Sequence, residues 1–230
     1  MIITDRFVFL HLHRSGGTFV NDFLLRFVPE ARRIGHHLPR KLVPPPAAGL
    51  PALGLVRNPW AFYVLWHSYQ SRLHVPNAVF RVVSEGGRLD FEHTIANLLE
   101  LGTTGRFLEE IVRSLPDRYT NRGLNLPGFA LEPIRASGRG LYSHLYYYLY
   151  DGPGVLHIRR VDRIREEFAS LLAAVGEPIT AAMRAHIRQS PAGEAPEAVE
   201  YTHLYGDTLR DIVAERDADI IARYGYRFGD

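Results

Sequence analysis

Near-continuous apolar runs alternate along this chain with apolar residues at helical spacing. The run at residues 7–12 is apolar at nearly every position, as in a strand covered on both faces of a parallel sheet. From Thr18 onward, Phe19, Phe23 and Phe27 recur every four residues, which predicts a helix directly after that strand. Further strands are predicted at 31–34, 53–56 and 155–158.

Capping residues and periodicity predict where the helices begin and end. Asn58 and Pro59 predict the start of a helix that runs toward Leu73, because Asn caps helix amino termini and Pro fits the first helical position. Gly176 predicts the end of another helix. The other helices are predicted at 91–101, 106–115, 140–150, 162–175 and 209–224. Loops or linkers are predicted at 74–90, 116–137 and 190–196.

This alternation predicts an α/β fold in three layers, with a mostly parallel central sheet flanked by helices. A chain of 230 residues suits one domain, which we expect over residues 1–230. In open α/β sheets, ligands bind outside the carboxyl ends of the strands. Arg14 and Arg57 both follow predicted strands, so the sequence predicts a binding site for an anion at that edge.

Composition excludes several classes of function. The 27 Lys and Arg against 25 Asp and Glu leave a net charge of +2, so neither nucleic acid nor a membrane surface is an expected partner. With 0 Cys there is no disulfide, no thiolate nucleophile and no Cys-based metal site. No apolar stretch approaches ~18–20 residues, and the first residues do not resemble a signal peptide, so we expect a cytoplasmic protein.

The loop after the first predicted strand has the chemistry of an anion site. Gly16 and Gly17 let the backbone approach a ligand closely, and the following helix directs its unpaired N–H groups to the same place. Arg14 adds a positive charge, while Ser15 and Thr18 add hydroxyl donors. A phosphate or sulfate group fits this set, and a plain glycine turn is the alternative. The absence of Gly-x-x-x-x-Gly-Lys-Ser/Thr disfavours ATP or GTP hydrolysis.

Two motifs resemble those of sulfotransferases. FLHLHRSGGT at residues 9–18 resembles the family's 5′-phosphosulfate loop, in which a strand precedes Lys-Ser/Thr-Gly-Gly/Thr-Thr. VRNPW at 56–60 resembles the second motif, a strand ending in Arg-Asn/Asp-Pro that holds the donor's 3′-phosphate. RVDRIREEF at 160–168 and RYGYRF at 223–228 are similar to later segments of the family, so the resemblance covers nearly the whole chain.

The resemblance implies a P-loop-like sulfotransferase architecture and a sulfuryl donor, 3′-phosphoadenosine 5′-phosphosulfate. The acceptor would be a hydroxyl or amine of a small molecule or carbohydrate, and the sequence gives neither its identity nor the oligomeric state. No metal is expected, since Arg14 and the loop N–H groups supply positive charge. The implied donor contacts are Arg14, Ser15, Gly16, Gly17, Thr18 and Arg57.

Two positions depart from the family pattern. Arg14 stands where the family has Lys; it can stabilise charge on the leaving oxygen but cannot donate a proton at pH 7. Leu65 stands where a Ser usually binds the 3′-phosphate. Ser68, about one turn later, is the expected substitute, with His67 and Tyr69 as the alternative donors. The alternatives left open are a non-catalytic nucleotide- or anion-binding protein of this fold and a phosphotransferase using the same anion site.

A general base would remove the proton of the acceptor. His36 and His37 follow the predicted strand at 31–34, and some carbohydrate sulfotransferases have a His in a similar place. One of the two is therefore the expected base, with a surface pair as the alternative. Joint metal binding is disfavoured, because adjacent strand residues point to opposite faces. His11 and His13 are assigned a structural role, with contact of His13 to the donor as the alternative.

Overall fold

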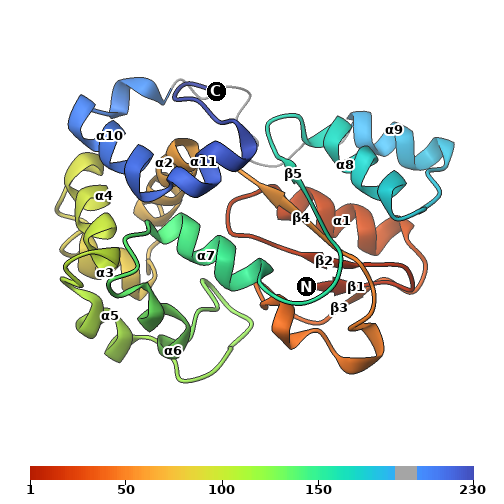
Figure 1. Cartoon of the computed structure of the whole chain (residues 1–230), viewed down its shortest axis with the longest axis horizontal. Coiled ribbons are helices and arrows are strands. Elements are labelled where there is room, and N and C mark those ends of the chain that lie inside the picture. Colours follow the sequence, from red (N-terminus) through yellow and green to blue (C-terminus); the bar gives the residue numbers. More distant parts are fainter. Residues whose placement is uncertain (190–200) are drawn as a thin grey trace. The chain divides into compact units, whose positions relative to one another are not determined.

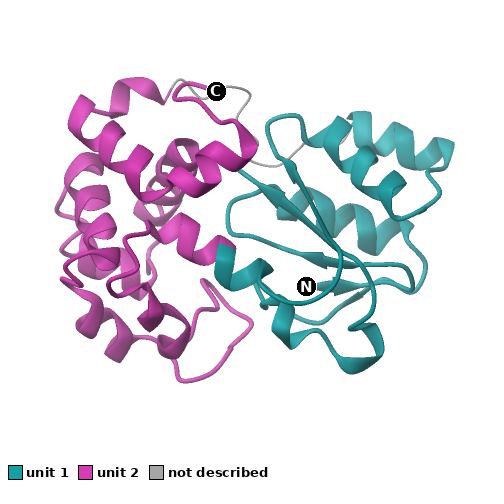
Figure 2. Cartoon of the chain, in the orientation of Figure 1, with its two compact units in different colours: residues 1–57, 147–197 teal, residues 58–146, 198–230 magenta. Residues whose placement is uncertain are grey.

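The chain divides into two units, and the predicted α/β sheet lies in the first of them (Figures 1 and 2). The computed structural model describes residues 1–189 and 201–230. Unit 1 comprises residues 1–57 and 147–197, and unit 2 comprises residues 58–146 and 198–230. The predicted linker at 190–196 lies outside the described residues, and a single domain over 1–230 stays a prediction.

Unit 1 contains a five-stranded sheet with the strand order β3-β1-β2-β4-β5. β2, β4 and β5 are parallel, whereas β1 is antiparallel to both β2 and β3. The α/β class and the helix-flanked sheet are thus confirmed, but the sheet is mixed rather than mostly parallel. The strands are β1 (Ile2–Ile3), β2 (Val8–Leu10), β3 (Arg32–Arg33), β4 (Ala52–Val56) and β5 (Leu156–Arg160).

A tight turn explains why part of the sheet is antiparallel. The backbone N–H of Thr4 donates to the carbonyl of Phe7 at 3.0 Å, and the Thr4 hydroxyl accepts from the N–H groups of Arg6 and Phe7. This turn reverses the chain over a few residues, and strands joined so closely can pair only antiparallel. β1 was missed in the sequence because two apolar residues give no periodicity.

Helices α1 (Gly17–Phe27), α8 (Ile164–Ala174) and α9 (Ala181–Gln189) form a core with the sheet of unit 1. Phe9, Leu53 and Leu55 face this core, where Phe23 meets Phe168 edge-on with ring centroids 5.0 Å apart. Every residue of β2 and β4 is buried. The near-continuous apolar runs therefore do mark strands covered on both faces.

The opposite face of β4 carries the last turn of α7 (Leu141–Tyr150). A Cβ at Gly54 would lie 2.6 Å from the Tyr150 hydroxyl, so the ring needs the glycine. That hydroxyl donates to the Leu55 carbonyl at 2.8 Å and accepts from the Leu55 N–H at 3.1 Å. Leu10 and Gly54 form the last pair between β2 and β4. The Tyr150 hydroxyl therefore supplies the hydrogen-bond partners of the Leu55 backbone, one residue beyond that pair.

The described part of unit 2 is helical. Asn58 Oδ1 accepts from the Trp60 N–H at 3.1 Å with Pro59 in the first turn, which confirms the predicted cap. The predicted loops at 74–90 and 116–137 are wrong in part, since each contains a short helix. The helices are α2 (Pro59–Ser71), α3 (Ala78–Val83), α4 (Phe91–Leu99), α5 (Leu108–Ser114), α6 (Gly128–Leu131), α10 (Asp207–Arg216) and α11 (Ala218–Tyr224).

The single helix predicted at 209–224 is also wrong, because α10 and α11 are separated at Asp217. Asp217 is buried, and its carboxylate accepts hydrogen bonds from the Tyr63 hydroxyl and the Ser143 N–H. The side chain turns inward at the junction between the two helices. None of the described helices has both the length and the apolar character needed to cross a membrane.

Candidate functional site

The carboxyl ends of β2 and β4 bring the two predicted anion-binding segments together. The strands are parallel neighbours, so the loop that follows β2 and the residue that follows β4 lie at the same edge of the sheet. Arg57 is buried, and its Nε donates to the carbonyl oxygen of Arg14 at 2.5 Å. A guanidinium from one strand end therefore holds the backbone of the loop on the other.

Gly16 joins this loop to α1 and has two reasons to be glycine. Its φ of +76° lies in the left-handed region, and a Cβ there would come within 2.5 Å of Ile164 Cδ1 and 2.8 Å of Val161 Cγ2. Arg14 is also left-handed, with φ +55°. Gly16, the N-cap of α1, has no side chain with which to bond the first-turn N–H groups. The positive end of a helix dipole is a suitable place for an anion.

Ser15 and Thr18 differ in what they can offer a ligand. Ser15 is buried, and its hydroxyl donates to the His13 carbonyl at 3.2 Å, so it holds the loop in shape. Thr18 lies in the first turn of α1 and is exposed. Arg14 is half-buried. Of the predicted hydroxyl donors, Thr18 therefore has the more open position.

Gly17, the first residue of α1, packs directly against His11. A Cβ at Gly17 would overlap the His11 imidazole ring. Asn21, one turn along α1, places its amide nitrogen 3.4 Å from Nδ1 of His11. Burial lowers the pKa of His11 to about 3, with smaller contributions from neighbouring positive charges, so the ring is neutral at physiological pH.

Replacing Gly17 by Ala is expected to lower the free energy of unfolding by about 1–3 kcal/mol, because the added methyl group must displace the His11 ring. Denaturant unfolding measures the loss. Gly49→Ala is the matched control, since nothing lies within 4 Å of a Cβ at Gly49. Equal stability changes in the two variants would show that the contact between Gly17 and His11 is unimportant.

His37 lies against the start of the same loop. Its Nδ1 is 2.8 Å from the carbonyl oxygen of His11, and since a carbonyl can only accept, Nδ1 carries the proton. The neutral ring then has its lone pair on Nε2. The His37 ring stacks on His13 with centroids 3.7 Å apart and planes inclined by 16°. His37 is therefore held by two residues at the start of the loop, His11 and His13.

The surroundings of His37 keep it uncharged. Burial lowers its pKa well below the usual value, and His13 and His11 lower it further. The pKa of His36 is also lowered, first by burial and then by Arg33. The ring centroids of His36 and His37 are 6.4 Å apart. An imidazole that is neutral at physiological pH can accept a proton, which is what a general base must do.

Ser68 lies on α2, in unit 2, and its carbonyl accepts from the Arg72 side chain at 3.1 Å. Its role as a contact for the donor therefore stays a prediction. Arg14, Arg57 and His37 all belong to unit 1. Sequence reasoning treated His13 as structural and did not single out Asn21; the available signal was the alternation of His11 and His13 with apolar residues.

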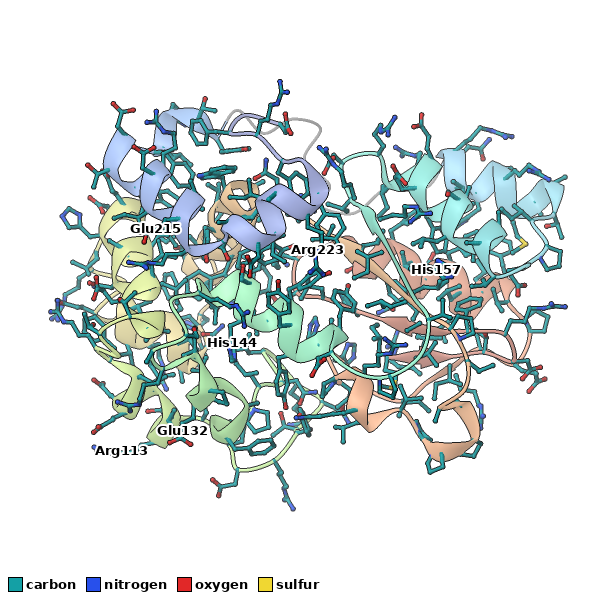
Figure 3. The ribbon with its side chains drawn as sticks, in the orientation of Figure 1. Arg113, Glu132, His144, His157, Glu215 and Arg223 are labelled. Atoms are coloured by element: carbon teal, nitrogen blue, oxygen red, sulfur yellow. The ribbon has the colours of Figure 1, made fainter. Side chains whose placement is uncertain are left out.

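Within residues 1–189 and 201–230, no three His, Asp or Glu side chains are grouped as metal ligands would be. The stacked rings of His13 and His37 agree with this, because nitrogen lone pairs lie in the ring planes and do not converge between parallel rings. Two histidines labelled in Figure 3 lie on other elements, His157 on β5 and His144 on α7. Nε2 of His144 bonds the Ala130 carbonyl at 2.8 Å.

Comparison with protein-family models, curated proteins and solved structures found no match to this chain. The class of the site follows from its residues. A glycine loop and a helix amino terminus that begins at glycine suit an anion, Arg57 fixes that loop, and His37 is a neutral imidazole held beside it. These features are those expected of an anion-binding site with a neighbouring base, and both roles stay predictions.

Proposed function

We propose that this protein is a sulfotransferase that moves a sulfuryl group from 3′-phosphoadenosine 5′-phosphosulfate to a hydroxyl or amine acceptor. The observation that carries the proposal is the hydrogen bond from Arg57 to the Arg14 carbonyl. It joins the two segments that resemble the family's donor-binding motifs, at the ends of neighbouring parallel strands. The proposal includes the three-layer, P-loop-like architecture of that family.

In this proposal, two parts of the site bind the two ends of the donor. The first-turn N–H groups of α1, the exposed Thr18 hydroxyl and Arg14 bind the 5′-phosphosulfate. Arg57 binds the 3′-phosphate, for which a planar guanidinium is well suited. Arg14 stabilises the charge that develops on the leaving phosphate oxygen and donates no proton.

The transfer step needs one nucleophile and one base. The acceptor oxygen or nitrogen forms a bond to sulfur, while the bond from sulfur to the 5′-phosphate oxygen breaks and its electron pair leaves with that oxygen. Nε2 of His37 takes the proton of the acceptor. The products are the sulfated acceptor and 3′-phosphoadenosine 5′-phosphate. His37 is assigned this role over His36 because its Nδ1 proton is bound to the His11 carbonyl, which leaves Nε2 as the basic atom.

Calorimetric titration with 3′-phosphoadenosine 5′-phosphate tests the donor site. We expect a Kd in the micromolar range, roughly −8 kcal/mol, and at least about tenfold weaker binding of adenosine 5′-phosphate, which lacks the 3′-phosphate. Absence of binding by the folded protein would overturn the proposal. Binding of ATP that is tighter than binding of the 3′,5′-bisphosphate would favour a phosphotransferase instead.

Turnover separates an enzyme from a binding protein of the same fold. We expect slow consumption of 3′-phosphoadenosine 5′-phosphosulfate even with water as acceptor, since the base and the charge-stabilising groups need no specific acceptor to be in place. Binding of the bisphosphate with no consumption of the donor above the rate in buffer would favour the non-catalytic alternative. The non-catalytic alternative is considered because Leu65 stands at a position where sulfotransferases usually have a Ser that binds the 3′-phosphate.

A further inference from the structure

We propose that His13 is a positioning residue for His37, holding the plane of its imidazole by face-to-face stacking so that Nε2 keeps one direction. The inference deepens the proposed function and rests on it. The two rings are 3.7 Å apart at their centroids and inclined by only 16°, whereas the His11 and His37 rings are tilted by 48° at 4.5 Å. His13 is thus the ring that covers the flat face of His37.

An imidazole needs two constraints to keep one orientation, and the structure supplies both. The hydrogen bond of Nδ1 to the His11 carbonyl holds one edge and sets the tautomer, but it leaves the ring able to rotate about that bond. Stacking on His13 removes this second freedom. Without either constraint, the Nε2 lone pair of His37 would no longer keep one direction toward the proton of the acceptor. The rate of transfer should then fall, because it depends strongly on the orientation of the reacting groups.

The backbone supports the same assignment. His37 has φ +49° and Arg14 has φ +55°, both left-handed conformations that non-glycine residues avoid. Such residues persist only where the surrounding structure holds them, and they gather at functional sites. Here a strained residue carries the base, and a strained residue carries the guanidinium proposed to stabilise the leaving group. The two are linked through His13, which precedes Arg14 and stacks on His37.

His11, whose carbonyl binds His37, is itself held by two residues of α1. The His11 carbonyl accepts from His37, while the His11 ring packs on Gly17 and lies 3.4 Å from the Asn21 amide. Both Gly17 and Asn21 belong to α1, the helix whose amino terminus faces the proposed anion site. His37 is therefore connected through His11 to α1, the helix proposed to bind the donor.

Among residues 1–189 and 201–230, the charged groups that act on the pKa of His37 are all basic. They are His11 and His13 after β2 and the α-amino group of Met1, and the adjacent residue is His36. The amino group bonds the Gly35 carbonyl. Protonation of His37 would place a charge beside these groups, so the acidic limb of the pH–rate profile reports the state of this cluster.

The test compares His13→Phe with His13→Leu in the full-length protein. Phe keeps a flat ring for stacking, whereas Leu fills similar space without one. The rate of donor consumption in water is measured across pH, together with the affinity for 3′-phosphoadenosine 5′-phosphate. We expect the plateau rate of His13→Phe within about 3-fold of wild type and that of His13→Leu about 10- to 30-fold lower, with unchanged affinity in both.

The pH profile distinguishes positioning from a general loss of structure. Both variants remove the His13 charge that lowers the pKa of His37, so the acidic limb should move to higher pH in both. Only His13→Leu should also lower the plateau. Equal plateaus in the two variants would overturn the proposal, and so would parallel losses of rate, affinity and thermal stability in both.

Nitrogen-15 NMR of the imidazoles tests the arrangement without any activity. We expect His37 to carry its proton on Nδ1 in the wild type and in both variants, because the His11 carbonyl sets the tautomer. The imidazole signals of His37 should broaden only in His13→Leu, where the ring can turn about that hydrogen bond. A wild-type His37 protonated on Nε2 would overturn the positioning proposal even if the donor binds. Failure of 3′-phosphoadenosine 5′-phosphate to bind, with the NMR result as expected, would instead overturn the proposed function alone.

Discussion

Replacing Arg57 by Ala is expected to weaken the binding of 3′-phosphoadenosine 5′-phosphate by about 100-fold. A hydrogen bond between charged groups contributes about 1.5–3 kcal/mol, and tenfold in affinity corresponds to about 1.4 kcal/mol. The variant loses the guanidinium proposed to bind the 3′-phosphate. It also loses the bond from Nε to the Arg14 carbonyl, so the loop proposed to bind the 5′ end is released. Calorimetric titration at fixed ionic strength measures the change.

Two variants control this experiment. Arg57→Lys keeps the charge but not the planar fork, so its affinity should lie between those of the wild type and the alanine variant. Arg6→Ala removes a side chain of the same type at the amino end of β2, where it is 56% exposed and 3.6 Å from Glu177. It should leave the affinity within about twofold, because an exposed charge away from the site interacts weakly through solvent. Wild-type affinity in Arg57→Ala would exclude this residue from the donor site.

Replacing Asp217 by Ala is expected to lower the free energy of unfolding by about 3 kcal/mol, because two buried donors lose their acceptor. The Asp217 carboxylate accepts from the Tyr63 hydroxyl at 2.8 Å and from the Ser143 N–H at 2.9 Å. Ser143 lies in the first turn of α7, so Asp217 caps that helix from the junction of α10 and α11. A Cβ at Gly140 would lie 2.6 Å from Asp217 Oδ2, so the carboxylate occupies space that only a glycine at this position leaves open.

The same carboxyl makes the stability depend on pH. Burial raises the pKa of Asp217 from 3.8 to about 6, although the hydrogen bonds from Ser143 and Tyr63 act in the opposite direction. The folded state therefore holds the proton more tightly than the unfolded state. This contribution to stability is complete below about pH 4 and is lost as the pH rises through about 6.

Urea unfolding between pH 4 and pH 7 of the wild type and Asp217→Asn isolates this contribution. The difference in unfolding free energy between the two proteins should change across that range, with the wild type relatively more stable at low pH. Asp219→Asn is the matched control, since Asp219 lies two residues further on α11 and its side chain is 58% exposed. A difference that stays constant with pH would show that Asp217 keeps its ordinary pKa in the folded protein.

Local pattern alone was sufficient for much of the fold and for part of the site. The buried strands β2 and β4, the helix α1 after the glycine loop, and the cap of α2 at Asn58 were all predicted. Each depends on residues within a few positions of one another: an apolar run, a four-residue repeat, or a side chain bonding the next turn. The same local reasoning predicted that Arg14 and Arg57 follow strands.

Contacts between distant residues decided the rest. That β2 and β4 are neighbours is a tertiary property. So is the bond from Arg57 to the loop at Arg14, since the two residues are 43 positions apart in the sequence. The proposal of His37 over His36 as the base rests on the His11 carbonyl and the His13 ring, which approach His37 only in the folded chain. The split at Asp217 likewise depends on Tyr63 and Ser143. Periodicity reports which face of an element is buried, whereas the partner of a buried polar group is set by tertiary packing.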